Sequence, residues 1–445
     1  MLLKIYRALF INTLFFYLLG GIIVLFGFSY FFPSMYFVTW GLLVSLVVAT
    51  VVDCIILFSQ KNALFARRST PERFSNGDEN EISIQLQNNY PFKVSFQIID
   101  EIPFQFQERN FLLKETLGAN KQKNIKYALT PFTRGEYEFG GLNIFISSPL
   151  GLIGKKYIFS SNSTVATYPS FLQINKYDFL AFSNNLSQIG LKKLRRIGNA
   201  LEFEQIKEYV QGENIRNINW KATAKKNALM INQFQDEKSQ PVYCFIDKGR
   251  TMKMPFNQLS LLDYAINSTL ILSNIILKKQ DKVGMLTFSN TIENRIAADR
   301  KGSQMNQIME SLYNVQTDFK ESDFNRLYME VKYKINQRSL ILLYTNFETL
   351  EGLYRQLPYL KAIAKMHMLI VVFFENTELN QFVKTKVNTT PEIFDQTIAQ
   401  KFIYEKKLII RELKKYGIHS LLSKPENLTV DSINKYLEMK ARGLI

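Results

Sequence analysis

Two long runs of apolar residues lie near the start of the chain. Residues 9–32 are almost uninterrupted apolar sequence without a charged side chain, and residues 36–58 form a second such run. Each run exceeds the roughly 20 residues that a helix needs to cross the hydrocarbon core of a bilayer. Pro33 and Ser34 mark a short turn between them, so the pattern predicts a transmembrane α-helical hairpin over residues 1–60. A cleaved signal peptide is the weaker interpretation, because no small-residue cleavage site follows the first run and a second run begins almost at once.

Basic residues flank this hairpin on one side only. Lys4 and Arg7 precede the first run, Lys61, Arg67 and Arg68 follow the second, and the connecting turn has neither Lys nor Arg. Cytoplasmic flanks of membrane spans carry an excess of Lys and Arg. We therefore expect a two-span protein of the inner (cytoplasmic) membrane, with its N- and C-termini and the large remainder of the chain in the cytoplasm.

One acidic residue, Asp53, lies near the inner end of the second run. An ionisable side chain within a membrane span often has a function. A carboxylate close to the headgroups can also cap the helix or reach the interface. Both interpretations remain open from the sequence.

Short runs of alternating apolar and polar residues follow the hairpin. They are punctuated by Asn, Gly and Pro, as in residues 75–78, 88–91 and 148–151. The predicted strands are residues 81–86, 93–99, 123–129, 135–139 and 142–146. This spacing is typical of an antiparallel β-sandwich, which we place at residues 68–175 as a packing and spacing domain.

The last part of the chain alternates apolar strands with helical patterns. The predicted strands are residues 242–246, 282–288, 291–297, 339–344 and 368–374, and the predicted helices are residues 258–277, 303–313, 323–335 and 391–415, with a last helix starting at Thr429 as its N-cap and ending near Gly443. This alternation predicts a Rossmann-type α/β domain over residues 241–445 with a mainly parallel sheet.

Candidate metal ligands follow two of these strands. An Asp-x-Ser-x-Ser loop after the first strand is the metal-ion-dependent adhesion site of von Willebrand factor A (vWA) domains, and Asp247 and Thr251 fit its first and last places. Gly249 has no side chain to donate, Asn346 stands where an Asp would be usual, and no middle Thr is recognised. Hard oxygen ligands suit Mg²⁺. The sequence therefore predicts a degenerate site at Asp247, Thr251 and Asn346, and leaves Mg²⁺ binding open.

Charge and composition limit the classes of partner that we expect. The 445-residue chain has 55 Lys and Arg against 39 Asp and Glu, a formal net charge of +16. The densest basic cluster, at residues 192–196, stands beside no nucleic-acid motif, so we expect proximity to anionic lipid and no nucleic-acid partner. Two cysteines and two histidines are too few for a disulfide framework or for most zinc sites.

The segment before the α/β domain, residues 176–240, combines a linker with the most distinctive pattern of the chain. Its candidate partner-binding residues are Glu202, Tyr209, Gly212, Glu213, Arg216, Asn219, Trp220 and Lys225. Two interpretations remain open: the segment joins two domains, or it is a docking surface. We expect Trp220 to bury its ring and Glu213 to pair with a basic side chain.

This pattern resembles the signature of the MoxR-associated vWA family, the bacterial group labelled domain of unknown function fifty-eight. The resemblance covers essentially the whole chain, from the apolar hairpin to a vWA-like α/β domain. The family more often has Asp at the positions of Glu213 and Asn219, and Arg at that of Lys225. The change at Asn219 removes a charge, which puts a charge-dependent role for that position in doubt.

The resemblance implies a membrane-anchored, non-enzymatic adaptor that works with a MoxR-type AAA+ ATPase in assembly or maturation of envelope proteins, with other vWA or envelope proteins as further partners. The chain has no Gly-x-x-x-x-Gly-Lys-Ser/Thr loop, so ATP hydrolysis would come from the partner. The alternatives are a metal-dependent hydrolase that uses Asp247, and a membrane scaffold that needs no ATP.

Overall fold

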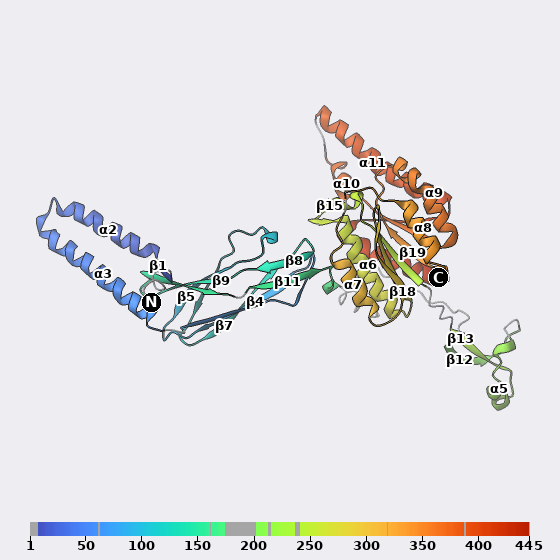
Figure 1. Cartoon of the computed structure of the whole chain (residues 1–445), viewed down its shortest axis with the longest axis horizontal. Coiled ribbons are helices and arrows are strands. Elements are labelled where there is room, and N and C mark those ends of the chain that lie inside the picture. The colour runs from blue at the N-terminus through green and yellow to red at the C-terminus, as the bar shows by residue number, and fades with distance from the viewer. Residues whose placement is uncertain are drawn as a thin grey trace. The chain divides into compact units, whose positions relative to one another are not determined.

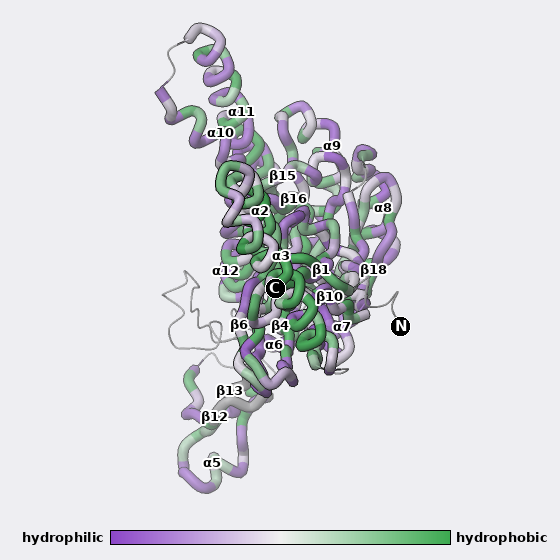
Figure 2. The backbone as a smooth tube through the Cα atoms, turned by 90° about the vertical axis from the view of Figure 1, so that its left-hand side faces the viewer, coloured by the Kyte–Doolittle hydropathy of each residue, from purple (hydrophilic) through white to green (hydrophobic). Residues whose placement is uncertain are grey.

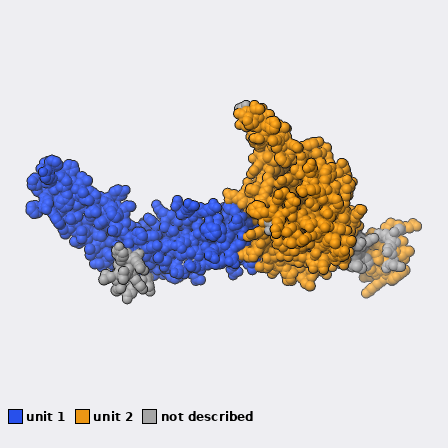
Figure 3. Space-filling model, turned by 45° about the horizontal axis from the view of Figure 1, so that its top comes forward, with its two compact units in different colours: residues 1–168 blue, residues 169–445 orange. Residues whose placement is uncertain are grey.

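The chain divides into two compact units, Met1–Tyr168 and Pro169–Ile445 (Figure 3). A computed structural model describes residues 8–60, 63–160, 162–173, 202–211, 215–235, 241–317, 319–386 and 389–444. Each unit is described by itself.

The first unit begins with two apolar helices, α2 (Thr13–Ser29) and α3 (Tyr36–Phe58), joined by a 3-10 turn at Pro33–Met35 (Figure 1). Both are largely hydrophobic along their length (Figure 2). Among the described helices, the segment Pro33–Phe58 is long and apolar enough to cross a membrane, whereas α2 has 17 residues. The first apolar run was predicted to be longer as a helix. It is shortened because Leu9–Ile11 forms strand β1, which pairs with a strand of the following domain.

A β-sandwich follows the helices. One sheet has the order β1-β10-β9-β5-β6. A second sheet has the order β2-β4-β7, and a third has the order β3-β11-β8. The strands are β2 (Leu64–Ser69), β3 (Arg73–Ser75), β4 (Asn80–Asn88), β5 (Val94–Asp100), β6 (Leu113–Leu117), β7 (Gln122–Leu129), β8 (Gly135–Phe139), β9 (Leu142–Ser147), β10 (Ile153–Phe159) and β11 (Ser163–Tyr168). All pairs are antiparallel except β3 with β11. The five predicted strands are all present, and alternate residues of β4 and β5 point into the core.

The C-terminal end of α3 is bound to the sandwich. Asp53 is fully buried, and its Oδ2 accepts hydrogen bonds from Ser148 Oγ and, at 3.2 Å, from the Ile153 N–H. Tyr90 Oη donates to the Leu57 carbonyl oxygen at 2.9 Å. These bonds give Asp53 a structural role at the junction between helix and sandwich.

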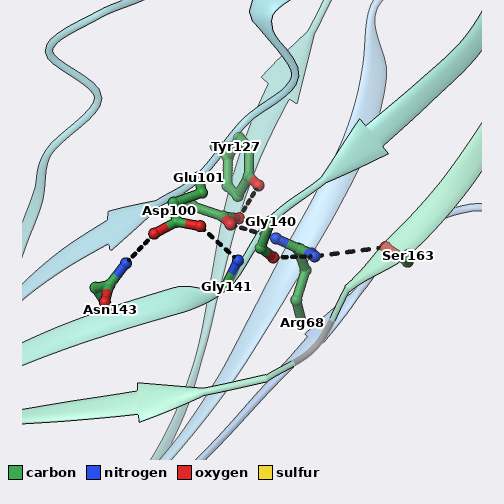
Figure 4. A network of polar contacts seen from close by, with 8 residues as sticks. All are labelled: Arg68, Asp100, Glu101, Tyr127, Gly140, Gly141, Asn143 and Ser163. Atoms are coloured by element: carbon green, nitrogen blue, oxygen red, sulfur yellow. Dashed lines mark hydrogen bonds and ion pairs between the residues drawn. The ribbon is translucent and has the colours of Figure 1, made fainter.

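A buried polar network joins two sheets of the sandwich (Figure 4). Arg68 on β2 pairs with Asp100 on β5, and Tyr127 on β7 donates a hydrogen bond to the same carboxylate. The Arg68 guanidinium also donates to the Gly140 carbonyl oxygen at 3.1 Å. Burial raises the pKa of Asp100, and the Arg68 charge and the two hydrogen bonds work against that rise. A buried charge pair of this kind is costly to break from one side.

The second unit contains a sheet of the order β18-β17-β14-β19-β20-β21, in which the edge strand β18 is antiparallel to β17 and the other pairs are parallel. Its strands are β14 (Pro241–Asp247), β17 (Lys282–Phe288), β18 (Ile292–Asp299), β19 (Leu340–Tyr344), β20 (Met368–Phe374) and β21 (His419–Ser423). Residues of β14 alternate between two cores, with Ile246 on one face and Phe245 on the other. Helices therefore cover both faces of the sheet.

The helices of this domain fall into two layers. On one face lie α6 (Leu261–Lys278), α7 (Gln304–Tyr313) and α12 (Leu428–Ala441); on the other lie α8 (Phe324–Lys334), α9 (Leu350–Met366) and α11 (Thr390–Lys415). The sequence predicted all of these helices except α9, which contains Pro358. The last helix begins at Leu428, so Thr429 is not its N-cap as predicted; Asn427 takes that place. The α/β fold with a mainly parallel sheet is confirmed.

Arg68→Met is expected to lower the free energy of unfolding at pH 7 by about 3–5 kcal/mol, because it leaves the Asp100 carboxylate buried without its cation. Removal of Arg68 raises the pKa of Asp100 further, so Asp100 is protonated in the folded state at a higher pH than in the unfolded chain. The folded variant then binds more protons than its unfolded chain, so its loss of unfolding free energy becomes smaller as the pH falls. Unfolding of the full chain in detergent micelles at pH 7 and pH 5 measures both effects. Lys126→Ala, which removes an exposed pair with Glu81, is the control and should change little.

Candidate functional site

The candidate site lies where the order of the sheet reverses. Numbered in chain order, the six strands stand in the spatial order 3-2-1-4-5-6, with the first strand β14 between β17 and β19. In such sheets, ligands bind outside the carboxyl ends of the strands at this switch point. Ile246 pairs with Tyr344 across β14 and β19. Asp247, the last residue of β14, and Thr345, which follows β19, therefore lie at neighbouring strand ends.

The Asp247 carboxylate is buried and fully engaged by hydrogen-bond donors. Its Oδ1 accepts from the Gly249 N–H at 2.8 Å and from Ser322 Oγ, and its Oδ2 accepts from Thr345 Oγ1 at 2.7 Å. Burial raises the pKa of Asp247, while these donors act in the opposite direction. The carboxylate is therefore held by the protein rather than presented to a reactant.

Ser322 takes the space that a side chain at position 249 would need. A Cβ atom built on Gly249 would overlap with Ser322 Oγ. The hydroxyl missing from the loop pattern at Gly249 is thus supplied from the loop before α8, far along the chain. Ser322 was not among the candidate residues predicted from the sequence, and neither was Thr345, although it directly precedes Asn346.

Asn346 faces a lysine instead of a second carboxylate. Lys406 Nζ on α11 donates to Asn346 Oδ1 at 2.5 Å. Burial lowers the pKa of Lys406 to about 8, and the nearby Glu348 works against this. Lys406 was not among the candidate residues, because nothing in its local sequence distinguishes it from the other lysines of that helix.

Protein donors contact the oxygens of the predicted metal site. Asp247 is the one carboxylate of the predicted set, both of its oxygens already accept hydrogen bonds, and an ammonium group contacts the Asn346 oxygen. Thr251 lies in a 3-10 turn, Arg250–Lys253, beside the same cleft. Across the part of the chain that the structure describes, no group of three or more His, Cys, Asp or Glu side chains could hold a metal ion.

A cleft of about 170 Å³ opens beside Asp247. Glu321 lies on its rim and is contacted by two arginines, Arg250 at 2.9 Å and Arg355 at 3.7 Å. All three side chains are exposed. The rim therefore offers both signs of charge to a partner.

The signature segment forms a small separate structure. Strands β12 (Glu202–Glu208) and β13 (Met230–Gln235) pair antiparallel, with the short helix α5 (Trp220–Lys226) between them in the chain. The Tyr209 N–H donates to the Leu229 carbonyl oxygen at 2.8 Å and extends the pairing.

Asn219 has a specific role in this segment. Its Oδ1 caps α5 by accepting from the Ala222 N–H at 3.0 Å, and its Nδ2 donates to Asn232 Oδ1 at 2.7 Å. An Asp could cap the helix but could not donate the second hydrogen bond. The neutral side chain at this position therefore suits its surroundings.

The expectation that Trp220 buries its ring was wrong. The side chain is 69% exposed, because a two-stranded hairpin with one short helix has no second layer to cover it. Lys225 is also exposed, in the last turn of α5. Gly212 and Glu213 lie outside the described residues, so the predicted pairing of Glu213 lies outside them as well. Glu202 lies in β12 and Arg216 lies in the 3-10 turn Ile215–Asn217; both are described in their backbone only.

An apolar hairpin, a β-sandwich and an α/β domain with a switch-point site thus make up a modular protein. Residues 205–383 match the family described as "Protein of unknown function DUF58". The chain therefore carries a DUF58 domain over these residues, and the family resemblance seen in the signature is confirmed.

Other relatives are more distant. The chain is 21% identical over 201 residues to "Uncharacterized protein YeaD" of Bacillus subtilis (strain 168), a match that covers 43% of this chain and 49%, about half, of that relative. The chain is also similar to the CARDB domain of a Pyrococcus furiosus protein (11% identity, TM-score 0.17, 24% of this chain and 94% of that one). A further similarity is to a PapD-like domain of human CEP192 (12% identity, TM-score 0.19, 24% and 85%). Structural similarities of this size support no conclusion.

Gly249→Ser restores the hydroxyl of the loop pattern but crowds Ser322, so it is expected to destabilise the domain by about 1–3 kcal/mol. Ser322→Ala removes a donor to Asp247 and is expected to cost a similar amount. In the double variant the hydroxyl introduced at position 249 can replace the lost donor in the space vacated by Oγ, so most of the stability should return. Thermal unfolding of the three variants measures this coupling, and simple additivity would contradict it.

Lys406→Met is expected to change how stability depends on pH. Lys406 loses its proton near pH 8 in the folded protein, against an ordinary value of 10.5 in the unfolded chain. Between these values the unfolded chain binds more protons, so Lys406 makes the native protein more stable as the pH rises through this window. The methionine variant should lack this contribution, whereas the exposed Lys407→Met control should keep it. Urea unfolding at pH 7 and pH 10 compares the three proteins.

Proposed function

We propose that this protein is a membrane-anchored, non-enzymatic adaptor whose α/β domain is a vWA-like domain with a degenerate metal site. It works with a MoxR-type AAA+ ATPase in assembly or maturation of envelope proteins. In this proposal α2 and α3 both cross the inner membrane, and both chain termini lie in the cytoplasm.

The observation that carries the proposal is the attachment of α3 to the β-sandwich through buried Asp53. Most large apolar side chains of α2 and α3 are exposed, which in water would be unfavourable. The same helices are joined to the sandwich by hydrogen bonds and by a shared core that includes Leu57 and Leu46. Such a joint suits a protein that holds its folded domains at a bilayer surface.

A basic residue at this joint supports the cytoplasmic orientation. Lys155 Nζ of the sandwich lies 3.4 Å from the Leu57 carbonyl oxygen and 4.6 Å from the centre of the Phe58 ring. A cation near the C-terminal end of a helix is favoured by the helix dipole, and cations are enriched on the cytoplasmic side. Arg68, by contrast, pairs with Asp100 inside the sandwich, whereas Lys155 is the basic residue that contacts the end of α3.

The switch-point site favours binding over catalysis. Both oxygens of the buried Asp247 carboxylate accept hydrogen bonds from the protein, which supports a structural role for this residue. The exposed Trp220 and Lys225 on the signature hairpin are suited to contact a partner, since Trp often contributes strongly to protein interfaces.

The test is binding of the full chain in nanodiscs to the purified MoxR-type ATPase of the same genome, with and without ATP. Trp220→Ala is expected to weaken binding about ten-fold or more. Tyr333→Ala, which removes a similarly exposed aromatic side chain (62%) from α8, is the control and should bind normally.

Three outcomes would contradict this proposal. Absence of binding would exclude the ATPase as a direct partner, and binding that ignores ATP would favour a passive scaffold. A hydrolytic activity of the purified protein that is lost in Asp247→Ala would instead favour a hydrolase.

A further inference from the structure

The first half of helix α11 extends beyond the α/β domain. The helix runs over 26 residues from a capping box at Thr389 and Glu392. Its second half contributes Ile409 and Leu413 to the core, whereas its first half projects from the domain together with the short helix α10 (Thr377–Phe382) (Figure 1). Gln396 Nε2 ties the two helices by donating to the Val383 carbonyl oxygen at 2.7 Å.

The projecting half carries a row of uncovered apolar side chains. Phe394, Ile398 and Phe402 follow one another at four-residue spacing, and their side chains are 70%, 44% and 40% exposed. Residues four apart form a continuous ridge along a helix. The ridge covers about 12 Å of helix, at 1.5 Å per residue, which is enough to contact two to three turns of a second helix.

This ridge leads into a cavity of about 230 Å³ at the carboxyl ends of β19, β20 and β21. Phe402 belongs to both the ridge and the cavity wall. The other apolar wall residues include Met254, Phe256, Phe374, Leu379 and Leu422. Because Phe402 belongs to both, we treat the exposed ridge and the cavity as one surface, which we call the α11 groove.

Acidic residues outnumber basic residues in the lining of the cavity by three to two. Glu348, Glu375 and Glu378 line it, against Lys406 and Lys407. Lys406 is directed to Asn346, with its Nζ 2.5 Å from the amide oxygen. The chain as a whole has a net charge of +16, so the cavity lining, with its excess of glutamates, is acidic by comparison. We call these glutamates the acidic rim.

We propose that the α11 groove binds an amphipathic helix of a partner protein, with apolar side chains on one face and Lys or Arg residues beside them. The apolar face would cover Phe394, Ile398 and Phe402 and insert a side chain into the cavity, and the basic residues would meet the acidic rim. Helix-in-groove recognition uses apolar anchors at this spacing, and charge complementarity selects among partners. An anionic bilayer is disfavoured by the same rim. The proposal stands apart from the ATPase partnership and needs neither ATP nor the signature hairpin.

The test uses the full chain in nanodiscs of zwitterionic phosphatidylcholine and two labelled peptides. One is an amphipathic helix of about 18 residues with Leu and Phe on one face and Lys on the other, long enough to form a helix. The second has Glu in place of each Lys. Fluorescence anisotropy, corrected with empty nanodiscs, should show the Lys peptide binding about ten-fold more tightly than the Glu peptide.

Variants locate the binding. Phe402→Asp and Ile398→Asp should each weaken the Lys peptide about ten-fold. Tyr404→Ala is the matched control, because this aromatic side chain is 55% exposed on another side of the same helix, and it should not change binding. Glu348→Gln combined with Glu378→Gln should reduce the preference for the Lys peptide while leaving the apolar groove intact, which keeps the test valid if the aspartate variants fold poorly.

Equal affinity for the two peptides, no binding of either, or normal binding by Phe402→Asp would overturn the proposal. A self-associated native chain that becomes monomeric in Ile398→Asp would also overturn it, since the groove would then be an interface with a second copy. Mass measurement of the nanodisc complexes distinguishes that outcome.

Discussion

The carboxylate of Asp53 is buried at the point where α3 meets the β-sandwich, and it accepts hydrogen bonds from Ser148 and from the Ile153 backbone. A polar group removed from water is stabilised by hydrogen bonds within the protein. The turn between β9 and β10 supplies two donors to Oδ2, so separation of the helix from this turn would break both hydrogen bonds. The apolar helices and the sandwich consequently belong to one compact unit, in which α3 shares a core with the strands.

A similar constraint shapes the α/β domain. Asp247 stands at the switch point, where open α/β sheets place their ligands, yet its oxygens are bound by Gly249, Ser322 and Thr345. Lys406 supplies a positive charge beside Asn346, close to where a metal-binding domain would hold its cation. The domain thus keeps the architecture of a ligand-binding sheet while its polar groups satisfy one another. Outside that point, the signature hairpin and the α11 groove carry exposed apolar side chains.

Much of the fold could be predicted from periodicity. Strands β17 and β20 begin and end at the predicted residues, because continuous apolar runs between polar turns describe buried parallel strands well. Helix α9 was not predicted, because Pro358 in its middle disfavours a helix. Its buried residues nevertheless repeat at helical spacing, at Leu353, Leu357, Leu360 and Ile363. Strand β1 was hidden in an apolar run for a different reason: pairing with β10, far along the chain, decides its conformation.

The sequence by itself determined that this chain has an apolar N-terminal segment, a β-rich middle and an α/β domain with Asp247 and Asn346 at strand ends. These properties follow from local periodicity and from the rule that parallel strands end at one edge. Only the tertiary structure decided that Ser322 fills the place of a side chain at Gly249, that Lys406 meets Asn346, and that Trp220 stays uncovered. Each of these depends on residues far apart in sequence, or on the absence of a covering layer, and local sequence carries no information on either.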